Sequence, residues 1–145
     1  VSDLDRATAF YRDLLGFEIS ARYGDSAVFL STGGYHHHIC LNTWAGKGAA
    51  PAPRGHTGMF HVAFLYPTRL ELAKILKNLM DAKYPLDGSA DHGVSEAIYL
   101  RDPDGNGVEL YVDRPREEWK VGNDGMVEMV TESLDLQSIM RELDV

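Results

Sequence analysis

Two strands and the tight turn between them are predicted from the stretch AIYLRDPDGNGVELYV, residues 97–112. Residues 97–100 and 108–112 are short apolar and aromatic runs, which are typical of strands. The segment DPDG at 102–105 favours a turn, because proline presets one backbone angle and aspartate and glycine tolerate the others. This stretch therefore predicts two strands joined by a turn.

A strand and a helix are predicted ahead of this stretch. Residues 59–66 form an apolar run that ends at Pro67, and the apolar residues after it recur three and four apart, as on one face of a helix. That stripe consists of Leu70, Leu72, Ala73, Leu76, Leu79 and Met80. The second half of the chain is thus predicted to run strand, helix, strands.

The first half begins with a predicted helix. Ser2 and Asp3 stand where a helix cap is expected, the apolar residues of 4–15 keep helical spacing, and Gly16 ends the pattern. Three strands divided by glycines are predicted over residues 17–23, 27–31 and 35–43. The sequence therefore predicts an α+β fold.

The two halves repeat each other at an offset of 70 residues, with residues 28–30 matching 98–100. Such duplicated units usually pair to bury a shared core. We expect one domain over residues 1–115, with module one at 1–44, a linker rich in proline, glycine and alanine at 45–58, and module two at 59–115. By the same repeat, module one should open with a strand, which would lie before Val1. Residues 116–145 form a tail whose apolar spacing predicts a helix that packs on the domain or on a partner.

The composition is that of a globular domain. The 145 residues are 44% hydrophobic and 25% charged, which is enough apolar material for a core. The apolar run at 59–66 is far shorter than the roughly 20 residues of a membrane span, so no membrane partner is expected. With 14 basic and 22 acidic residues the net charge is −8, which argues against a nucleic-acid partner. Cys40 has no second cysteine to pair with, which favours a reducing, cytoplasmic location.

Histidines and one carboxylate on predicted strands are the candidates for chemistry. His36, His37 and His38 stand together, and in a strand His37 would point away from the other two; the simpler interpretation is an exposed edge strand. His61 lies in an apolar strand and must find a partner, either a carbonyl in the core or a metal. Glu109 must be outward-facing, paired or bound to a metal, because burying a lone carboxylate is costly. If both face one cavity, they supply two ligands of a His-His-carboxylate Fe(II) site.

The stretch from His92 to Glu109 resembles the signature of the extradiol ring-cleavage dioxygenases of the vicinal oxygen chelate, or glyoxalase, superfamily. Tyr99 follows His92 by seven residues, Glu109 follows Tyr99 by ten, and a DPDG turn lies between them. Only Ala90 departs from that signature. Residues 2–17, 29–41 and 60–64 are similar to other parts of the family, so the resemblance covers residues 1 to about 115.

The resemblance implies a role for each candidate. His61 and Glu109 would bind Fe(II), with Mn(II) as the alternative metal, and a third ligand, a histidine, would precede Val1. His37 would be the acid-base residue, or His38 if the alignment slips by one. Tyr99 would hydrogen-bond the substrate oxygen, and His92 would line the substrate pocket; the simpler interpretations are a core tyrosine and a solvated loop histidine.

The resemblance therefore implies an extradiol dioxygenase, an oxidoreductase of aromatic compound catabolism, that inserts O2 into the ring of a catechol-like substrate. It also implies two tandem βαβββ modules whose sheets form a curved mixed cup around the metal, and a homodimer. One alternative on the same fold is a glyoxalase-type isomerase or lyase, in which His38 could be a ligand. The other is a binding protein that sequesters a small molecule without a metal.

Overall fold

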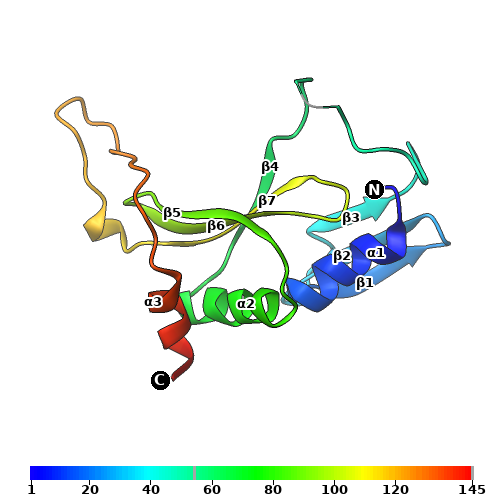
Figure 1. Ribbon diagram of the computed structural model, residues 1–145, viewed down its shortest axis with the longest axis horizontal. Coiled ribbons are helices and arrows are strands. Elements are labelled where there is room, and N and C mark those ends of the chain that lie inside the picture. Colours follow the sequence, from blue (N-terminus) through cyan, green and yellow to red (C-terminus); the bar gives the residue numbers. More distant parts are fainter. Residues whose placement is uncertain (54, 145) are drawn as a thin grey trace. The chain divides into compact units, whose positions relative to one another are not determined.

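The computed structural model describes residues 1–53 and 55–144 and divides the chain into two compact units (Figure 1). The first unit is Val1–Met59 with Asp102–Asn106, and the second is Phe60–Arg101 with the chain from Gly107 onward. The chain is an α+β protein with one antiparallel and one mixed sheet. None of the helices described is both long and apolar enough to cross a membrane.

The first unit is a helix followed by an antiparallel sheet. Its helix begins at Asp3, whose side chain accepts a hydrogen bond from the Arg6 N–H at 2.9 Å, and the chain leaves helical geometry at Gly16, where φ is +81°. The elements are α1 (Leu4–Ala9), the π-helical η1 (Phe10–Leu14), β1 (Glu18–Tyr23), β2 (Ala27–Ser31) and β3 (Ile39–Asn42), with the strands in the order β1-β2-β3. The predicted helix is therefore present, with its last turns widened to π-helix.

The third strand of this unit is shorter than predicted, because it begins at Ile39 and leaves the three histidines outside it. Gly33 and Gly34 both have positive φ, at 65° and 76°, so the chain turns there before it can extend. The imidazoles of the three histidines bond locally, His36 to His37 and His38 to Ser31. The prediction of a strand over residues 35–43 was wrong for 35–38.

The second unit runs strand, helix, three strands. Its elements are β4 (His61–Leu65), α2 (Arg69–Asp81), β5 (Leu86–Asp91), β6 (Ser95–Arg101) and β7 (Gly107–Asp113). The sheet order is β4-β7-β6-β5, in which β4 pairs parallel to β7 and the other pairs are antiparallel. Strand β5 was not predicted; its sequence, LDGSAD, has no apolar run to reveal it.

The core of the second unit lies between one face of this sheet and α2 (Figure 1). Side chains alternate across a strand, so Val108, Leu110 and Val112 of β7 are buried on this face while Glu109 projects from the other. The helix contributes Leu72, Leu76 and Leu79, all fully buried. The core thus fixes which face of the sheet is left for chemistry.

After β7 the chain returns to the same sheet. The short helices η2 (Arg116–Glu118), α3 (Leu136–Met140) and η3 (Arg141–Asp144) follow in order. Between them, Glu132 pairs antiparallel with Asp91, at the end of β5. Ile139 of α3 is fully buried, and α3 contacts α2.

Candidate active site

Four predicted site residues of the second unit form one hydrogen-bonded chain on the face of the sheet opposite α2. Glu109 lies at its centre: Oε2 is 2.8 Å from His61 Nε2, and Oε1 accepts a hydrogen bond from the Tyr99 hydroxyl at 3.2 Å. His92 Nε2 is 2.7 Å from the same hydroxyl. The structure therefore brings His61, Glu109, Tyr99 and His92 together.

The strand register explains this convergence. Tyr99 of β6 and Glu109 of β7 are direct cross-strand partners, so their side chains leave the same face side by side. In β4, Ala63 is opposite Glu109, and His61 is two residues earlier on the same face, opposite Gly107. A Cβ at Gly107 would lie 2.3 Å from the Phe60 carbonyl oxygen, so β4 comes as close to β7 as only glycine permits. That approach brings the His61 ring within reach of Glu109.

Burial and charge keep the tyrosine protonated. Burial, the neighbouring Glu109 charge and the hydrogen bond to Glu109 together raise the pKa of Tyr99 to about 12. The side chain of Glu109 is 14% exposed and that of His61 is 30% exposed. Near neutral pH Tyr99 is therefore a hydrogen-bond donor beside a largely buried carboxylate.

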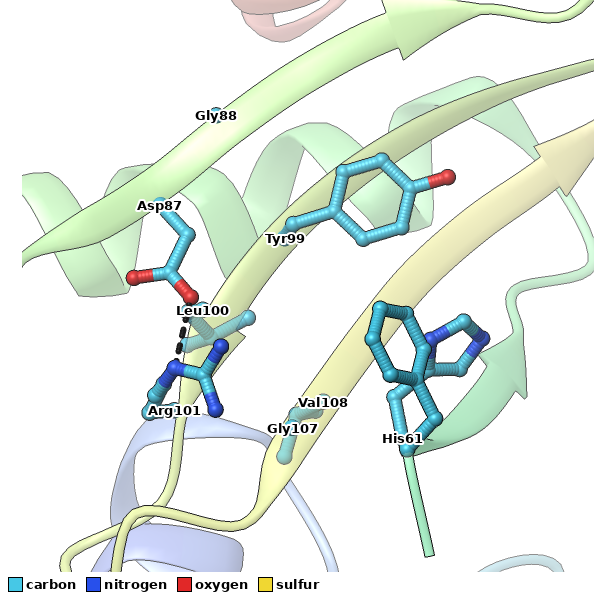
Figure 2. Close-up of a pocket in the computed structure, with 9 residues that line it drawn as sticks. His61, Asp87, Gly88, Tyr99, Leu100, Arg101, Gly107 and Val108 are labelled. Atoms are coloured by element: carbon cyan, nitrogen blue, oxygen red, sulfur yellow. Dashed lines mark hydrogen bonds and ion pairs between the residues drawn. The ribbon is translucent and has the colours of Figure 1, made fainter. Parts of the chain in front are cut away.

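A pocket of about 270 Å³ opens beside these residues (Figure 2). Figure 2 shows Tyr99 and His61 on the same face of the sheet, with an ion pair between Arg101 and Asp87, 2.9 Å long, at the other end of the pocket. The lining residues are Phe60, His61, Asp87, Gly88, Tyr99, Leu100, Arg101, Gly107 and Val108. Cavities of about 150 Å³ accept benzene, so this space accommodates one substituted aromatic ring.

His61 and Glu109 have the chemistry of a metal-ligand pair. An imidazole nitrogen and a carboxylate oxygen face each other from neighbouring strands, and this donor set suits non-haem Fe(II). Within the residues that the structure describes, no cluster of three or more His, Cys, Asp or Glu side chains could hold a metal ion. The pair thus fits two positions of a three-ligand site.

The remaining predicted site residue, His37, belongs to the first unit. Its Nδ1 lies 2.7 Å from His36 Nδ1, and its ring packs edge-on against Phe29 at 5.1 Å. The prediction that His37 points away from its neighbours was wrong, because these residues are not in a strand. His38 is held separately, its Nδ1 3.2 Å from Ser31 Oγ and accepting from the Thr32 N–H at 3.3 Å.

One partner of the site was missed by sequence reasoning. The backbone carbonyl of Val130, in the tail beyond β7, is 2.8 Å from His92 Nδ1. A carbonyl is present at every position, so no residue type marks this one in the sequence. Only the tertiary structure reveals that the tail reaches the site.

The chain is similar in sequence to curated dioxygenases. The Glyoxalase/Bleomycin resistance protein/Dioxygenase superfamily pattern matches residues 1–110. A catechol-2,3-dioxygenase of Bacillus subtilis (strain 168) is 35% identical over 143 residues, which are 98% of this chain and 49% of the relative. A biphenyl-2,3-diol 1,2-dioxygenase of Rhodococcus globerulus is 34% identical over 77% of this chain and 58% of the relative. The chain thus spans about half the length of these curated relatives.

Solved structures agree on the fold. A lactoylglutathione lyase from Agrobacterium tumefaciens is 28% identical with a TM-score of 0.58, covering 77% of this chain and 87% of the other. A glyoxalase/dioxygenase from Nostoc punctiforme has a TM-score of 0.65 at 17% identity, covering 79% and 86%. Similarity at the latter level concerns the fold alone.

Proposed function

The chain belongs to the glyoxalase/bleomycin resistance protein/dioxygenase superfamily, and on that premise we propose that it is a non-haem Fe(II)-dependent extradiol dioxygenase acting on a catechol-like aromatic. The observation that carries the proposal is the convergence of His61 and Glu109 with Tyr99 and His92. The names of the relatives point the same way, since both act on aromatic diols. The substrates would be that diol and O2.

His61 and Glu109 would hold Fe(II), or Mn(II) as the alternative, and the proposal requires a third protein ligand besides this pair. When bound, the metal supplies Lewis acidity, which makes a catechol hydroxyl easier to deprotonate, together with redox chemistry toward O2. The ligand side chains of such sites are oriented by hydrogen bonds from neighbouring groups. Here the Tyr99 hydroxyl would orient the carboxylate of Glu109, to which it is bonded.

The other residues would bind substrate and move protons. Tyr99, protonated because its pKa is about 12, would donate a hydrogen bond to a substrate oxygen, and His92 would border the substrate. His37 would take up and return a proton during attack on the ring, as a histidine can near neutral pH; His38 is the alternative in that role. Phe60, at the wall of the pocket, would contact the ring.

The broader organisation belongs to the same proposal. The element orders of the two units support tandem copies of one module, with the domain at 1–115, its modules at 1–44 and 59–115, the linker at 45–58 and the tail at 116–145. The curved cup of sheets, the homodimer and the cytoplasmic location stay predictions. Each follows from the family resemblance or the composition, and each is open to direct measurement.

A second candidate, a glyoxalase-type lyase or isomerase, is favoured by the similarity to a lactoylglutathione lyase. Metal preference separates the two. Zn(II) or Ni(II) with a fourth protein ligand would indicate the lyase or isomerase, whereas Fe(II) with three ligands would indicate the dioxygenase.

Metal analysis of the natural full-length protein, purified without oxygen, followed by oxygen uptake with a panel of catechols, tests the proposal. We expect about one iron per chain and a yellow ring-cleavage product. Glu109→Ala should lose the metal while keeping the fold, because one of the ligands is gone. Glu117→Ala is the matched control, since Glu117 is exposed and forms no ion pair among the described residues. Unchanged iron in Glu109→Ala would contradict its role as ligand, and a metal-free, inactive protein would indicate a small-molecule binder.

A further inference from the structure

The tail beyond β7 forms a short backbone pairing with the residues that carry His92. The Asp91 N–H donates to the Glu132 carbonyl at 3.0 Å, and the Glu132 N–H donates back to the Asp91 carbonyl at 2.9 Å. The Val130 N–H donates to the His92 carbonyl at 3.1 Å. These three bonds fix the backbone of residues 130–132 beside His92. The Val130 carbonyl is therefore held in a fixed position next to Nδ1 of the His92 ring.

That contact determines where the His92 ring carries its proton. A backbone carbonyl can only accept a hydrogen bond, so the 2.8 Å contact with Val130 requires a proton on Nδ1. In a neutral imidazole the other nitrogen, Nε2, then has a lone pair, and it is 2.7 Å from the Tyr99 hydroxyl. The Tyr99 hydroxyl has one proton, so it donates to either Glu109 Oε1 at 3.2 Å or His92 Nε2 at 2.7 Å. With neutral His92, the shorter contact to Nε2 is the one that the bare nitrogen accepts, in exchange for the bond to Glu109.

We propose that residues 130–132 are a positioning element of the active site, in which the Val130 carbonyl holds His92 as the tautomer that accepts from Tyr99. Because Nδ1 is bonded to the tail, Nε2 is the ring nitrogen that faces the Tyr99 hydroxyl. The catalytic consequence rests on the proposed function, whereas the tautomer itself does not.

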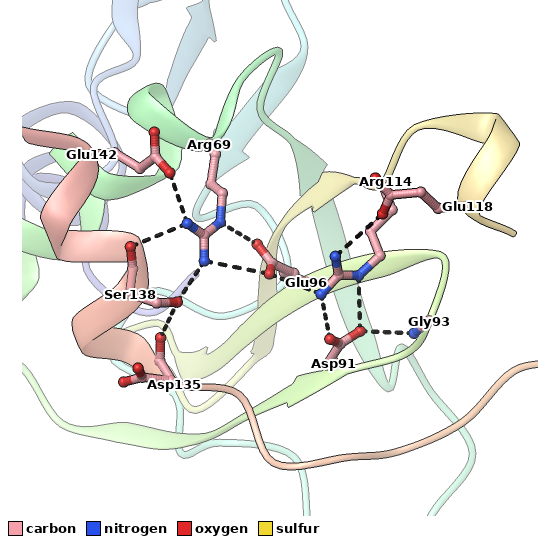
Figure 3. A network of polar contacts seen from close by, with 9 residues as sticks. All are labelled: Arg69, Asp91, Gly93, Glu96, Arg114, Glu118, Asp135, Ser138 and Glu142. Atoms are coloured by element: carbon pink, nitrogen blue, oxygen red, sulfur yellow. Dashed lines mark hydrogen bonds and ion pairs between the residues drawn. The ribbon is translucent and has the colours of Figure 1, made fainter. Parts of the chain in front are cut away.

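A network of charges holds Asp91 and Gly93, the residues on either side of His92 in the chain (Figure 3). The Asp91 carboxylate accepts from the Gly93 N–H at 2.8 Å and is paired with Arg114. Arg114 also contacts Glu96 at 3.1 Å, and Glu96 accepts from Arg69 at 2.7 Å. His92, between Asp91 and Gly93, is therefore fixed by its neighbours as well as by its ring.

The network also ties down the far end of the tail. Arg69 donates to the Ser138 carbonyl at 3.1 Å and to Glu142 at 2.7 Å (Figure 3). The tail is thus anchored at 130–132 and again at α3 and η3, on the sheet and on α2. Because residues 130–132 are anchored, the Val130 carbonyl stays in one place and can hold the His92 ring in one orientation.

The first experiment reads the tautomer directly. The measurement is 15N NMR of the full chain, labelled with 15N at histidine and free of paramagnetic metal. A ring nitrogen without a proton resonates far from one that carries a proton. The His92 signals are assigned by their absence from His92→Gln. We expect neutral His92 to show a protonated Nδ1 and a bare Nε2. The opposite tautomer would overturn the proposal, whether or not the protein proves to be a dioxygenase.

The second experiment perturbs the tail. Val130→Pro removes the N–H that donates to the His92 carbonyl. Thr131→Pro is the control, because the Thr131 N–H donates no hydrogen bond within the described part of the chain. In Val130→Pro we expect a mixture of His92 tautomers, retained metal, and a kcat on catechol lowered by about 10- to 100-fold, as when an orienting partner of a site histidine is lost. Thr131→Pro should match the wild type.

The outcomes distinguish a failure of the positioning role of residues 130–132 from a failure of the proposed dioxygenase function. An unchanged tautomer or an unchanged kcat in a folded Val130→Pro protein would overturn the positioning role. If Val130→Pro does not fold, the wild-type tautomer decides. A wild type that shows the expected tautomer but consumes no oxygen would count against the proposed function and leave the assignment of the His92 proton intact.

Discussion

At the scale of single residues, the short contact between His36 and His37 restricts their protons. Two Nδ1 atoms 2.7 Å apart can share one hydrogen bond only if one carries a proton and the other does not. One of the two rings must therefore be neutral, with its own proton on Nε2. Either ring can supply the shared proton, and such a histidine suits a role as acid or base.

Replacing His37 tests that role. His37→Phe should keep the metal, because His61 and Glu109 are untouched, and should lower kcat on catechol by roughly 10²- to 10⁴-fold, the usual contribution of general acid-base catalysis. His36→Phe is the control, since it removes the same hydrogen bond but leaves the proposed acid-base group. Steady-state oxygen uptake gives both values. Normal turnover in His37→Phe would transfer the role to His38 or remove it.

The strands and the turn that carry Tyr99 and Glu109 could be predicted from the residue pattern, whereas the role of Tyr99 was implied by the family resemblance. The structure shows why the two side chains meet, because the turn makes them cross-strand neighbours. The orientation of His37 could not be predicted, because glycines and local imidazole bonds replaced the strand there. The contact between Val130 and His92 depends on a backbone atom, which sequence does not distinguish.

At the scale of elements, α2 and β5 show what a residue pattern can and cannot predict. The N-cap of α2, Thr68, accepts from the Glu71 N–H at 3.1 Å. Four residues of its predicted apolar stripe, Leu72, Ala73, Leu76 and Leu79, are buried, whereas Leu70 and Met80 at the ends of the stripe are exposed. Strand β5 was missed because an edge strand with two aspartates and a glycine owes its structure to its neighbour β6. Patterns thus reveal the elements that bury a face and miss those that only complete a sheet.

Two leucines of α2 test how much a buried position contributes to stability compared with an exposed one. Leu76 is fully buried and Leu70 is 38% exposed on the same helix. We expect Leu76→Ala to lower the free energy of unfolding by about 2–5 kcal/mol, because a buried leucine leaves a cavity. Leu70→Ala should cost much less than this. Urea unfolding of both variants checks the prediction, and equal losses would mean that the helix packs differently from the structure described.

At the scale of the whole molecule, ion pairs join segments that are far apart in the sequence. Glu96, whose side chain is 8% exposed, lies between Arg69 and Arg114, and Arg69 reaches the last helices. A hydrogen bond from Arg114 lowers the pKa of Asp91, although burial opposes the shift. The folded chain therefore binds a proton at Asp91 less readily than the unfolded chain does.

This difference predicts a pH dependence of stability. A lowered pKa in the folded state stabilises the fold above the ordinary aspartate pKa, and the contribution is lost as pH falls through the folded value. Asp91→Asn should therefore be less stable than the wild type at pH 7, by about 1–2 kcal/mol. The gap should close as the solution is acidified through the ordinary aspartate pKa and below it.

Thermal or urea unfolding across this pH range makes the measurement. Asp113→Asn is the control, because Asp113 is exposed and forms no ion pair among the residues described. A gap between Asp91→Asn and the wild type that stayed constant from pH 7 to well below the ordinary aspartate pKa would show that protonation of Asp91 is not its cause.

Strand β5, at the outer edge of the four-stranded sheet, also bears on how copies of the protein meet one another. A flat, uncharged edge strand invites strands from other molecules and so favours aggregation. Here the edge is broken by a register shift between Leu86 and Gly88, carries the charges of Asp87 and Asp91, and is covered at its end by Glu132. The irregular, acidic sequence that concealed this strand from prediction is therefore suited to keeping concentrated solutions of the protein free of intermolecular sheets.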